Sequence, residues 1–349
     1  MKMKRMWIKT GVVLLGAGCW FLALLFYGKM GKQAGYFNAY YDMPVLTRNA
    51  LSAFMEQTEQ PEALPQMTGW SIEEKQSVSS EIRGNITADV WKIAGSVESF
   101  FAGQLAGGSY PWEEDEQGCM VSTALAEKLF GTKNVQGNQI TIAGSDYFIR
   151  GCIESSERFA AVRAEDEEGL EGLFLKYKEK SEPASSAQNL LMRMTGKEPD
   201  GFLEGNLYSA LARVVVSLPI WILFFVYMRK GYSQLNRITG FGLRLSVKLL
   251  ATGVIGGMVT IGLMWTLRFS GDYLPVMWSD VGFFPKLVAE KQEIFRELQQ
   301  RLLCPGDAKL FSDLKNTVLF AGISILAEVM IASVGKTHMF LIQENNKES

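Results

Sequence analysis

Residues 10–27 read TGVVLLGAGCWFLALLFY, an uncharged apolar stretch of the length that crosses a bilayer as an α-helix. Three more apolar stretches lie at residues 207–228, 249–267 and 317–334. Each is close to the roughly 20 residues that a membrane-spanning helix needs. Because only helices and closed barrels satisfy their backbone polar groups in lipid, we expect four transmembrane helices.

A long polar segment, residues 29–206, separates the first apolar stretch from the second. It contains many turn residues and is long enough for a folded domain. The chain as a whole is 48% hydrophobic with a mean hydropathy of only +0.06, so a large aqueous part dilutes the apolar stretches. The net charge of −2 gives no basis for nucleic-acid binding. We therefore expect an aqueous domain inserted between the first and second helices.

The distribution of basic residues predicts the topology, since segments rich in Lys and Arg stay on the cytoplasmic side. Four basic residues precede the first span and five lie between the second and third: Lys2, Lys4, Arg5 and Lys9, then Arg229, Lys230, Arg237, Arg244 and Lys248. We expect a multi-pass cell-membrane protein whose large domain is extracytoplasmic. The predicted segments are 1–28 (cytoplasmic start and first helix), 29–206 (extracytoplasmic domain), 207–228 (second helix), 229–248 (cytoplasmic loop), 249–267 (third helix), 268–316 (extracytoplasmic loop), 317–335 (fourth helix) and 336–349 (cytoplasmic tail).

A cleaved signal peptide is the alternative for the first span. Its basic start and apolar run fit such a signal, and Cys19 follows a short small-residue sequence. The apolar run continues past that cysteine to Phe26, however, whereas a processed signal ends its apolar region before the cleavage point. We therefore expect a retained helix.

The extracytoplasmic domain mixes strand and helix patterns. The expected strands lie at residues 86–93, 118–122, 139–142, 147–153 and 172–177. Residues 123–130 have helical spacing, and Gly131 is suited to end that helix. Residues 36–60 are expected to form a helical or irregular lead-in. The combination predicts an α+β domain.

The four cysteines leave one pairing open. Cys19 lies in the first span, where a small buried side chain is expected. The other three cysteines lie in predicted extracytoplasmic segments, and a Cys119–Cys152 disulfide is one possibility that spacing alone does not decide.

A series of segments in this domain resembles a known family. VSTALAEKLFG at residues 121–131, GNQITI at 137–142 and YFIRGC at 147–152 follow the order of the strand, helix and hairpin in the MacB-type periplasmic core domain. The similarity extends over residues 97–153. It implies the MacB-type fold, in which these residues shape the domain and carry no catalysis.

The membrane part is similar to that of MacB/FtsX-type permeases. Arg237 and Gly240 match an Arg–x–x–Gly element in the cytoplasmic loop of that family, and Ile255-Gly256-Gly257 matches a Gly–Gly step in its third span. The resemblance implies that this loop docks on a separate ABC ATPase and that two copies, or a pair of permeases, associate. The expected coupling residues are Arg229, Lys230, Arg237, Gly240 and Arg244.

Two features of the spans are candidates for helix packing. Gly253-x-x-x-Gly257, together with Gly256, offers a small-residue face for close helix contact, although glycine is also generally common in membrane helices. Glu328 is a carboxyl group inside the fourth span, where it is either functional or a neutral or snorkelling member of a packing interface.

The outer loop contains an amphipathic segment at residues 286–303. Leu287, Ile294, Leu298 and Leu302 fall close to one helical face. This face either packs on the extracytoplasmic domain or lies at the lipid surface.

No catalytic, metal or cofactor site is expected in this chain. Its single histidine, His338, lies at the predicted cytoplasmic end, so no Ser/His/Asp or Cys/His arrangement can form outside. The leading hypothesis is a non-catalytic, permease-like subunit that transmits the motion of a separate ATPase to the outer domain, for substrate export or activation of a partner. The alternative is a membrane-anchored binding or signalling protein without an ATPase. The absence of an acidic residue at Ala251 and Thr252, where the family usually has one, leaves this alternative open.

Overall fold

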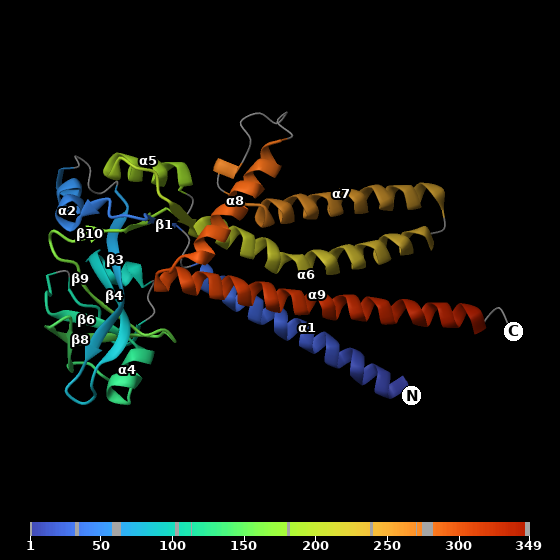
Figure 1. Cartoon of the computed structure of the whole chain (residues 1–349). Helices are drawn as coiled ribbons and strands as arrows, with labels where there is room; N and C mark the ends of the chain where they lie inside the picture. Colours follow the sequence, from blue (N-terminus) through green and yellow to red (C-terminus); the bar gives the residue numbers. More distant parts are fainter. Residues whose placement is uncertain are drawn as a thin grey trace. The chain divides into compact units, whose positions relative to one another are not determined.

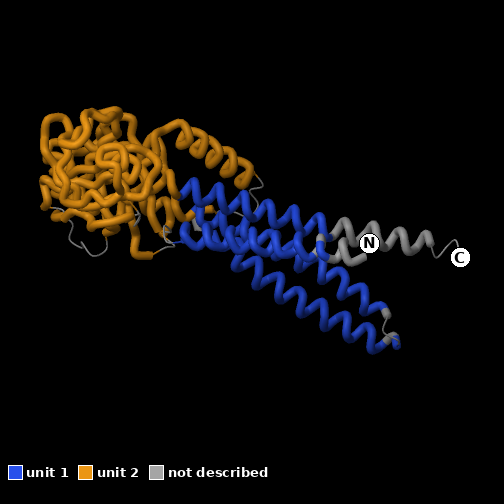
Figure 2. The backbone as a smooth tube through the Cα atoms, turned by 90° about the horizontal axis from the view of Figure 1, so that it is seen from below, with its two compact units in different colours: residues 1–33, 207–269, 310–349 blue, residues 34–206, 270–309 orange. Residues whose placement is uncertain are grey.

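The computed structural model describes residues 2–31, 35–57, 64–101, 105–112, 114–179, 182–237, 240–269, 271–273 and 282–345. The chain forms two compact units, coloured separately in Figure 2. We call residues 1–33, 207–269 and 310–349 the helical unit, and residues 34–206 and 270–309 the mixed unit. Each unit is therefore assembled from segments that are far apart in the sequence.

The helical unit consists of long apolar helices (Figure 1). They belong to α1 (Lys2–Met30), α6 (Gly205–Gln234), α7 (Phe241–Thr266) and α9 (Pro305–Asn345), with the short η2 (Leu235–Arg237) between α6 and α7. Each contains a membrane-length stretch with a mean hydropathy between 1.6 and 2.1. The prediction of four long apolar helices is confirmed.

Small residues and ring contacts bring these helices together. A Cβ added to Gly16 of α1 would lie 3.1 Å from Cβ of Ala327 in α9, and one added to Gly262 of α7 would lie 2.7 Å from the ring of Trp221 in α6. The indole of Trp20 donates a hydrogen bond of 3.0 Å to a carbonyl of α6. Helices pack this closely in apolar surroundings because glycine lets the backbones approach.

A ten-stranded sheet forms the centre of the mixed unit. Its order is β12-β1-β11-β3-β4-β9-β6-β8-β5, and β7 pairs with both β3 and β8. Most pairs are antiparallel, but β4/β9 and β6/β8 are parallel. The strands are β1 (Tyr36–Tyr40), β3 (Gln66–Ser79), β4 (Ile86–Gly95), β5 (Leu105–Gly108), β6 (Gly118–Ser122), β7 (Gln139–Ile142), β8 (Ser145–Ile153), β9 (Phe159–Arg163), β11 (Gly172–Lys176) and β12 (Gly201–Glu204). The short β2 (Leu46–Thr47) and β10 (Gly169–Leu170) form a separate pair.

Helices α2 and α5 lie towards one end of this sheet, and α4 lies towards the other (Figure 1). The mixed unit contains α2 (Arg48–Gln57), α3 (Val97–Phe100), α4 (Thr123–Phe130), α5 (Ala184–Thr195), η3 (Gly271–Tyr273) and α8 (Phe283–Gln300). Leu51 of α2 and Leu191 of α5 share one apolar cluster with β1 and β11. Leu125 and Leu129 of α4 share another with β6 and β8.

The expected α+β pattern is largely confirmed at the level of elements. Helix α4 has the predicted bounds, Ser122 caps its start through a hydrogen bond to the Leu125 amide, and Gly131 ends it with a φ of 75°. The expected strands correspond to β4, β6, β7, β8 and β11.

The expectation for residues 36–60 is wrong in its first part. Tyr36–Tyr40 forms β1, a strand buried over its whole length, and α2 follows from Arg48. A strand buried on both faces has no alternation of apolar and polar residues, so the usual strand signal is missing.

The Cys119–Cys152 disulfide does not form, and both residues are buried free thiols. The two cysteines lie on neighbouring strands but not opposite each other: Cys119 faces Ile149, and Cys152 faces Val121. Burial raises the pKa of both thiols, that of Cys152 to about 11. They serve as small apolar side chains in the cluster beneath α4.

The amphipathic segment of the outer loop forms α8, which packs on the mixed unit. Leu298 is fully buried, and Leu287 and Ile294 are half-buried on the same face. Leu302 remains exposed. Packing on the domain is therefore the correct one of the two alternatives for this helix.

Candidate functional site

A buried polar cluster joins β1 to the first turn of α9. The Asn38 amide donates a hydrogen bond of 2.7 Å to Oδ2 of Asp307, and the Tyr40 hydroxyl donates one of 2.5 Å to the same oxygen. Sγ of Cys304 lies 3.1 Å from the Asn38 amide nitrogen. The Trp70 indole donates to Oδ1 of Asn38 at 3.0 Å, so the cluster also reaches β3.

This cluster lies entirely inside the protein. Asn38 and Asp307 have no exposed surface, and Tyr40 is 3% exposed. Burial, and then the neighbouring Asp307 carboxyl, raises the pKa of the Tyr40 hydroxyl and of the Cys304 thiol. Both groups therefore stay protonated and act as fixed hydrogen-bonding partners, which suits a structural joint better than a reactive site.

A buried ion pair forms a second joint, between β12 and α8. Glu204 ends β12 with its side chain 3% exposed, and its Oε1 lies 2.8 Å from Nζ of Lys291. The Tyr273 hydroxyl donates a hydrogen bond to the other carboxylate oxygen. Burial lowers the pKa of Lys291, but the neighbouring carboxylates of Glu204 and then Glu290 more than offset this and leave the pKa raised. Lys291 therefore keeps its positive charge at neutral pH.

The two joints lie on adjacent strands. Strand β1 pairs antiparallel with β12, so that Phe37 faces Glu204 and Tyr40 faces Gly201. Strand β1 follows α1, β12 leads into α6, η3 follows α7, and Asp307 belongs to the first turn of α9. The segments that connect the mixed unit to all four long helices are therefore tied together along one edge of the sheet.

Sequence reasoning did not find these residues. Asp307 and Asn38 are separated by 269 positions, and Glu204 and Lys291 by 87, so no local spacing connects them. One usable signal was the position of Glu204, a carboxylate directly before a long apolar stretch.

The predicted coupling residues occupy the end of α6, the short connection and the start of α7. Arg229 and Lys230 are exposed, and neither meets a carboxylate within the described ranges. Gly240 precedes α7 with a φ of 104°, which only glycine adopts without strain, and Arg244 is half-buried. The side chain of Arg237 lies outside the described residues. The docking role of this loop stays a prediction.

Among the described residues, the predicted small-residue face of the third span meets open space. A Cβ added to Gly253, Gly256 or Gly257 would meet no atom within 4 Å. Oε2 of Glu328 is buried without a hydrogen-bond partner in the part of the chain that the structure describes. The close contacts within the chain use Gly16 and Gly262 instead, which the sequence pattern did not single out.

The chain combines four helices of membrane-spanning length with a mixed α/β unit built on a ten-stranded sheet, which is the architecture of a multi-span protein with a large aqueous domain. No protein-family model matches this sequence. No curated protein matches it either.

Solved structures are similar to about half of the chain. One is the periplasmic region of MacB from Actinobacillus actinomycetemcomitans, with 11% identity, a TM-score of 0.40, and coverage of 50% of this chain and 90% of that one. Another is the extracellular domain of the noncanonic ABC-type transporter YknZ from Gram-positive bacteria, with 13% identity, a TM-score of 0.37, and coverage of 48% and 97%. A third is a domain assigned to a permease protein from Porphyromonas gingivalis, with 15% identity, a TM-score of 0.36, and coverage of 48% and 86%. MacB is thus among the matching structures, as the sequence resemblance predicted.

Proposed function

We propose that the chain is a permease-like membrane subunit of an ABC transporter system, with its mixed unit inserted between the first and second transmembrane helices on the extracytoplasmic side. The observation that carries this proposal is that two separate segments of the chain form the mixed unit. Residues 34–206 and 270–309 fold together, so both segments must lie on the same side of a membrane that the four long helices cross.

The charge distribution supports the same topology. The mixed unit contains 33 acidic and 19 basic residues, whereas the remainder of the chain contains 4 acidic and 16 basic residues. Short basic segments beside membrane helices are retained in the cytoplasm. The excess of basic residues before α1 and between α6 and α7 therefore supports a cytoplasmic position for those ends.

In this proposal a separate ATPase binds the loop at residues 229–248 and hydrolyses ATP. Its motion reaches the mixed unit through the long helices, because the two buried joints hold the four connections to one sheet edge. The mixed unit then expels a substrate or activates a partner outside the membrane. No covalent chemistry in this chain is required.

Cysteine labelling of intact cells tests the topology. The variant Glu81→Cys places a thiol on an exposed loop of the mixed unit, and Lys230→Cys places one at the exposed end of α6. We expect a membrane-impermeant maleimide to label the first variant in intact cells and the second only after permeabilisation. The native Cys119 and Cys304 are fully buried with raised thiol pKa values, so they should stay unlabelled in the folded protein. The opposite labelling pattern would overturn the proposed function.

Purification from the native membrane tests the ATPase partner. We expect an ATP-binding protein to co-purify with the chain, and its recovery to fall at least tenfold in the triple variant Arg229→Glu, Lys230→Glu, Arg244→Glu, because reversed charges repel an acidic docking surface. Lys128→Glu, an exposed change on α4, is the matched control and should leave recovery unchanged. Purification without any ATP-binding protein would instead favour the anchored binding or signalling protein.

A further inference from the structure

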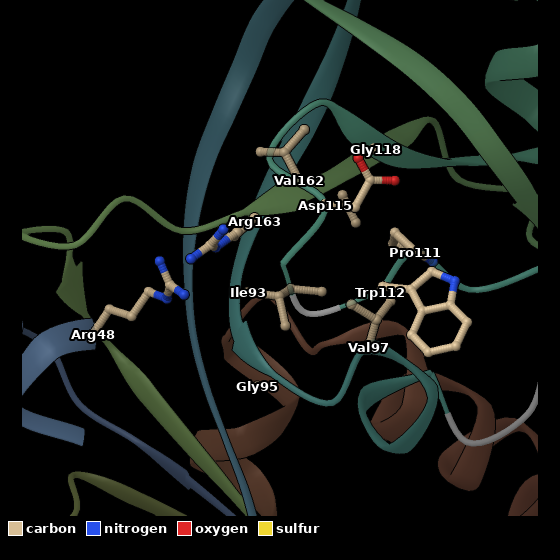
Figure 3. A pocket seen from close by; sticks show the side chains of 11 residues that line it. Arg48, Ile93, Gly95, Val97, Pro111, Trp112, Asp115, Gly118, Val162 and Arg163 are labelled. Atoms are coloured by element: carbon tan, nitrogen blue, oxygen red, sulfur yellow. The ribbon is translucent and has the colours of Figure 1, made fainter. Parts of the chain in front are cut away.

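A small hollow lies on the mixed unit between β4, β9 and the loop that precedes β6 (Figure 3). Its apolar wall includes Ile93, Val97, Pro111 and Trp112. The enclosed volume is about 20 Å³, slightly more than one water-sized group requires. Only a compact polar group can enter, and the rest of any ligand must lie outside against the rim.

Two arginines line the other side of this hollow. Arg48 is the first residue of α2, Arg163 is the last of β9, and Figure 3 shows their guanidinium groups pointing toward one another. Their side chains are only 14% and 23% exposed, whereas their acidic partners are much more exposed. Asp166 lies 2.7 Å from Arg48 and is 66% exposed, and Glu116 lies 3.3 Å from Arg163 and is 81% exposed. Each charge is thus compensated by an acid that is itself largely in solvent.

These arginines retain unused hydrogen-bonding capacity. Nε of Arg163 is buried and has no hydrogen-bond partner among the described residues. A buried donor without a partner costs free energy, which an incoming acceptor would recover. A carboxylate between the two guanidinium groups would also reduce the repulsion that remains between their like charges.

Trp112 supplies an anchor for the apolar part of a ligand. It is 82% exposed, although such a large apolar side chain is usually covered. The loop behind it is held in place, because Arg150 donates hydrogen bonds of 2.7 and 3.3 Å to Asp115, which also lines the hollow. These hydrogen bonds lower the pKa of Asp115, so its negative charge is present but already engaged by Arg150.

We propose that this hollow binds a carboxylate carried on a short apolar body, with the carboxylate between Arg48 and Arg163 and the body against Pro111 and Trp112. The planar guanidinium matches a carboxylate with two parallel hydrogen bonds. The mixed unit has a net charge of −14, so long-range attraction does not concentrate anions there. Binding would come from the two arginines themselves. The free C-terminus of an apolar peptide and a small free acid share this chemistry.

Titration calorimetry on the full-length protein in detergent tests the site with N-acetyl-leucine and N-acetyl-leucinamide, which differ in the carboxylate. We expect the acid to bind at least tenfold more tightly than the amide. Arg48→Gln and Arg163→Gln should each lower the affinity for the acid at least tenfold. Arg158→Gln is the matched control, because this exposed arginine lies just before the opposite end of β9. Thermal unfolding of each variant checks that it is folded.

Peptides distinguish the two sources of the carboxylate. A four-residue peptide that ends in leucine is compared with its C-terminal amide and with N-acetyl-leucine. If the peptide binds more tightly than both its C-terminal amide and N-acetyl-leucine, the ligand is a peptide C-terminus. If the peptide and N-acetyl-leucine bind with equal affinity, the ligand is the free acid. The proposed carboxylate site would be overturned by any of three results. These are equal binding of acid and amide, no binding of either probe, and unchanged affinity for the acid in both folded arginine variants. Such a failure leaves the proposed permease function untouched, because that proposal does not use this hollow.

Discussion

Gly172→Ala is expected to destabilise the mixed unit strongly. Gly172 faces Trp70 across the β11/β3 pair, and a Cβ at this position would lie 2.0 Å from an indole carbon. Trp70 cannot withdraw easily, because it is 3% exposed and contacts the rings of Tyr40, Trp91 and Phe100. Overpacking of a close-packed core costs about 1–3 kcal/mol and more where backbone is fixed on both sides. We expect the unfolding midpoint, followed by tryptophan fluorescence in detergent, to fall by roughly 10 °C or more.

Gly84→Ala is the control for this substitution. A Cβ added to Gly84 meets no atom within 4 Å, and the residue is exposed in the turn between β3 and β4. Its midpoint should stay within about 2 °C of the unmodified protein, since surface substitutions usually change stability by less than about 0.5 kcal/mol. Similar midpoints for the two variants would show that Trp70 and β11 are not packed as closely as described.

Features that depend on neighbouring residues could be read from the sequence. The bounds of α4 follow from Ser122 and Gly131, which cap the helix from positions directly beside it. The strands β7 and β8 follow from two apolar runs around Ala143 and Gly144, whose backbone adopts positive φ values. The long helices follow from the simple requirement that about 20 apolar residues span a bilayer.

Features that depend on distant residues could not be read in this way. Strand β1 is buried throughout, so it has no periodicity, and its role follows only from its place between β12 and β11. The joints formed by Asp307 and by Glu204 each bring together segments that belong to different predicted parts of the chain. The same holds for helix packing. Gly16 and Gly262 lie close to Ala327 and Trp221, but their local sequence does not distinguish them from Gly253, which has no such neighbour.

Glu204→Gln is expected to have the second large effect. The substitution removes the charge that faces Lys291, whose side chain is only 22% exposed, and leaves that ammonium group with only the 61% exposed carboxylate of Glu290, 3.4 Å away. Breaking one half of a buried ion pair costs about 3–5 kcal/mol, whereas replacing both partners by neutral groups is often nearly neutral. We therefore expect the free energy of unfolding to fall by about 3 kcal/mol in Glu204→Gln. In the double variant Glu204→Gln, Lys291→Met, the free energy of unfolding should return to within about 1 kcal/mol of that of the unmodified protein.

The exposed pair of Glu127 and Lys133 provides the matched comparison. Its atoms are 3.6 Å apart and its side chains are 54% and 60% exposed, so Glu127→Gln should cost less than about 1 kcal/mol. Strand β12 leads directly into α6, and α8 precedes α9. The double variant therefore also distinguishes a role of the joint in stability from a role in transmitting motion between these segments. If the charged joint only holds the fold, the double variant retains the proposed ATP-dependent activity. If the joint carries motion between these segments, the double variant is stable but loses that activity. A single variant as stable as the unmodified protein would show that Glu204 and Lys291 do not form the buried pair.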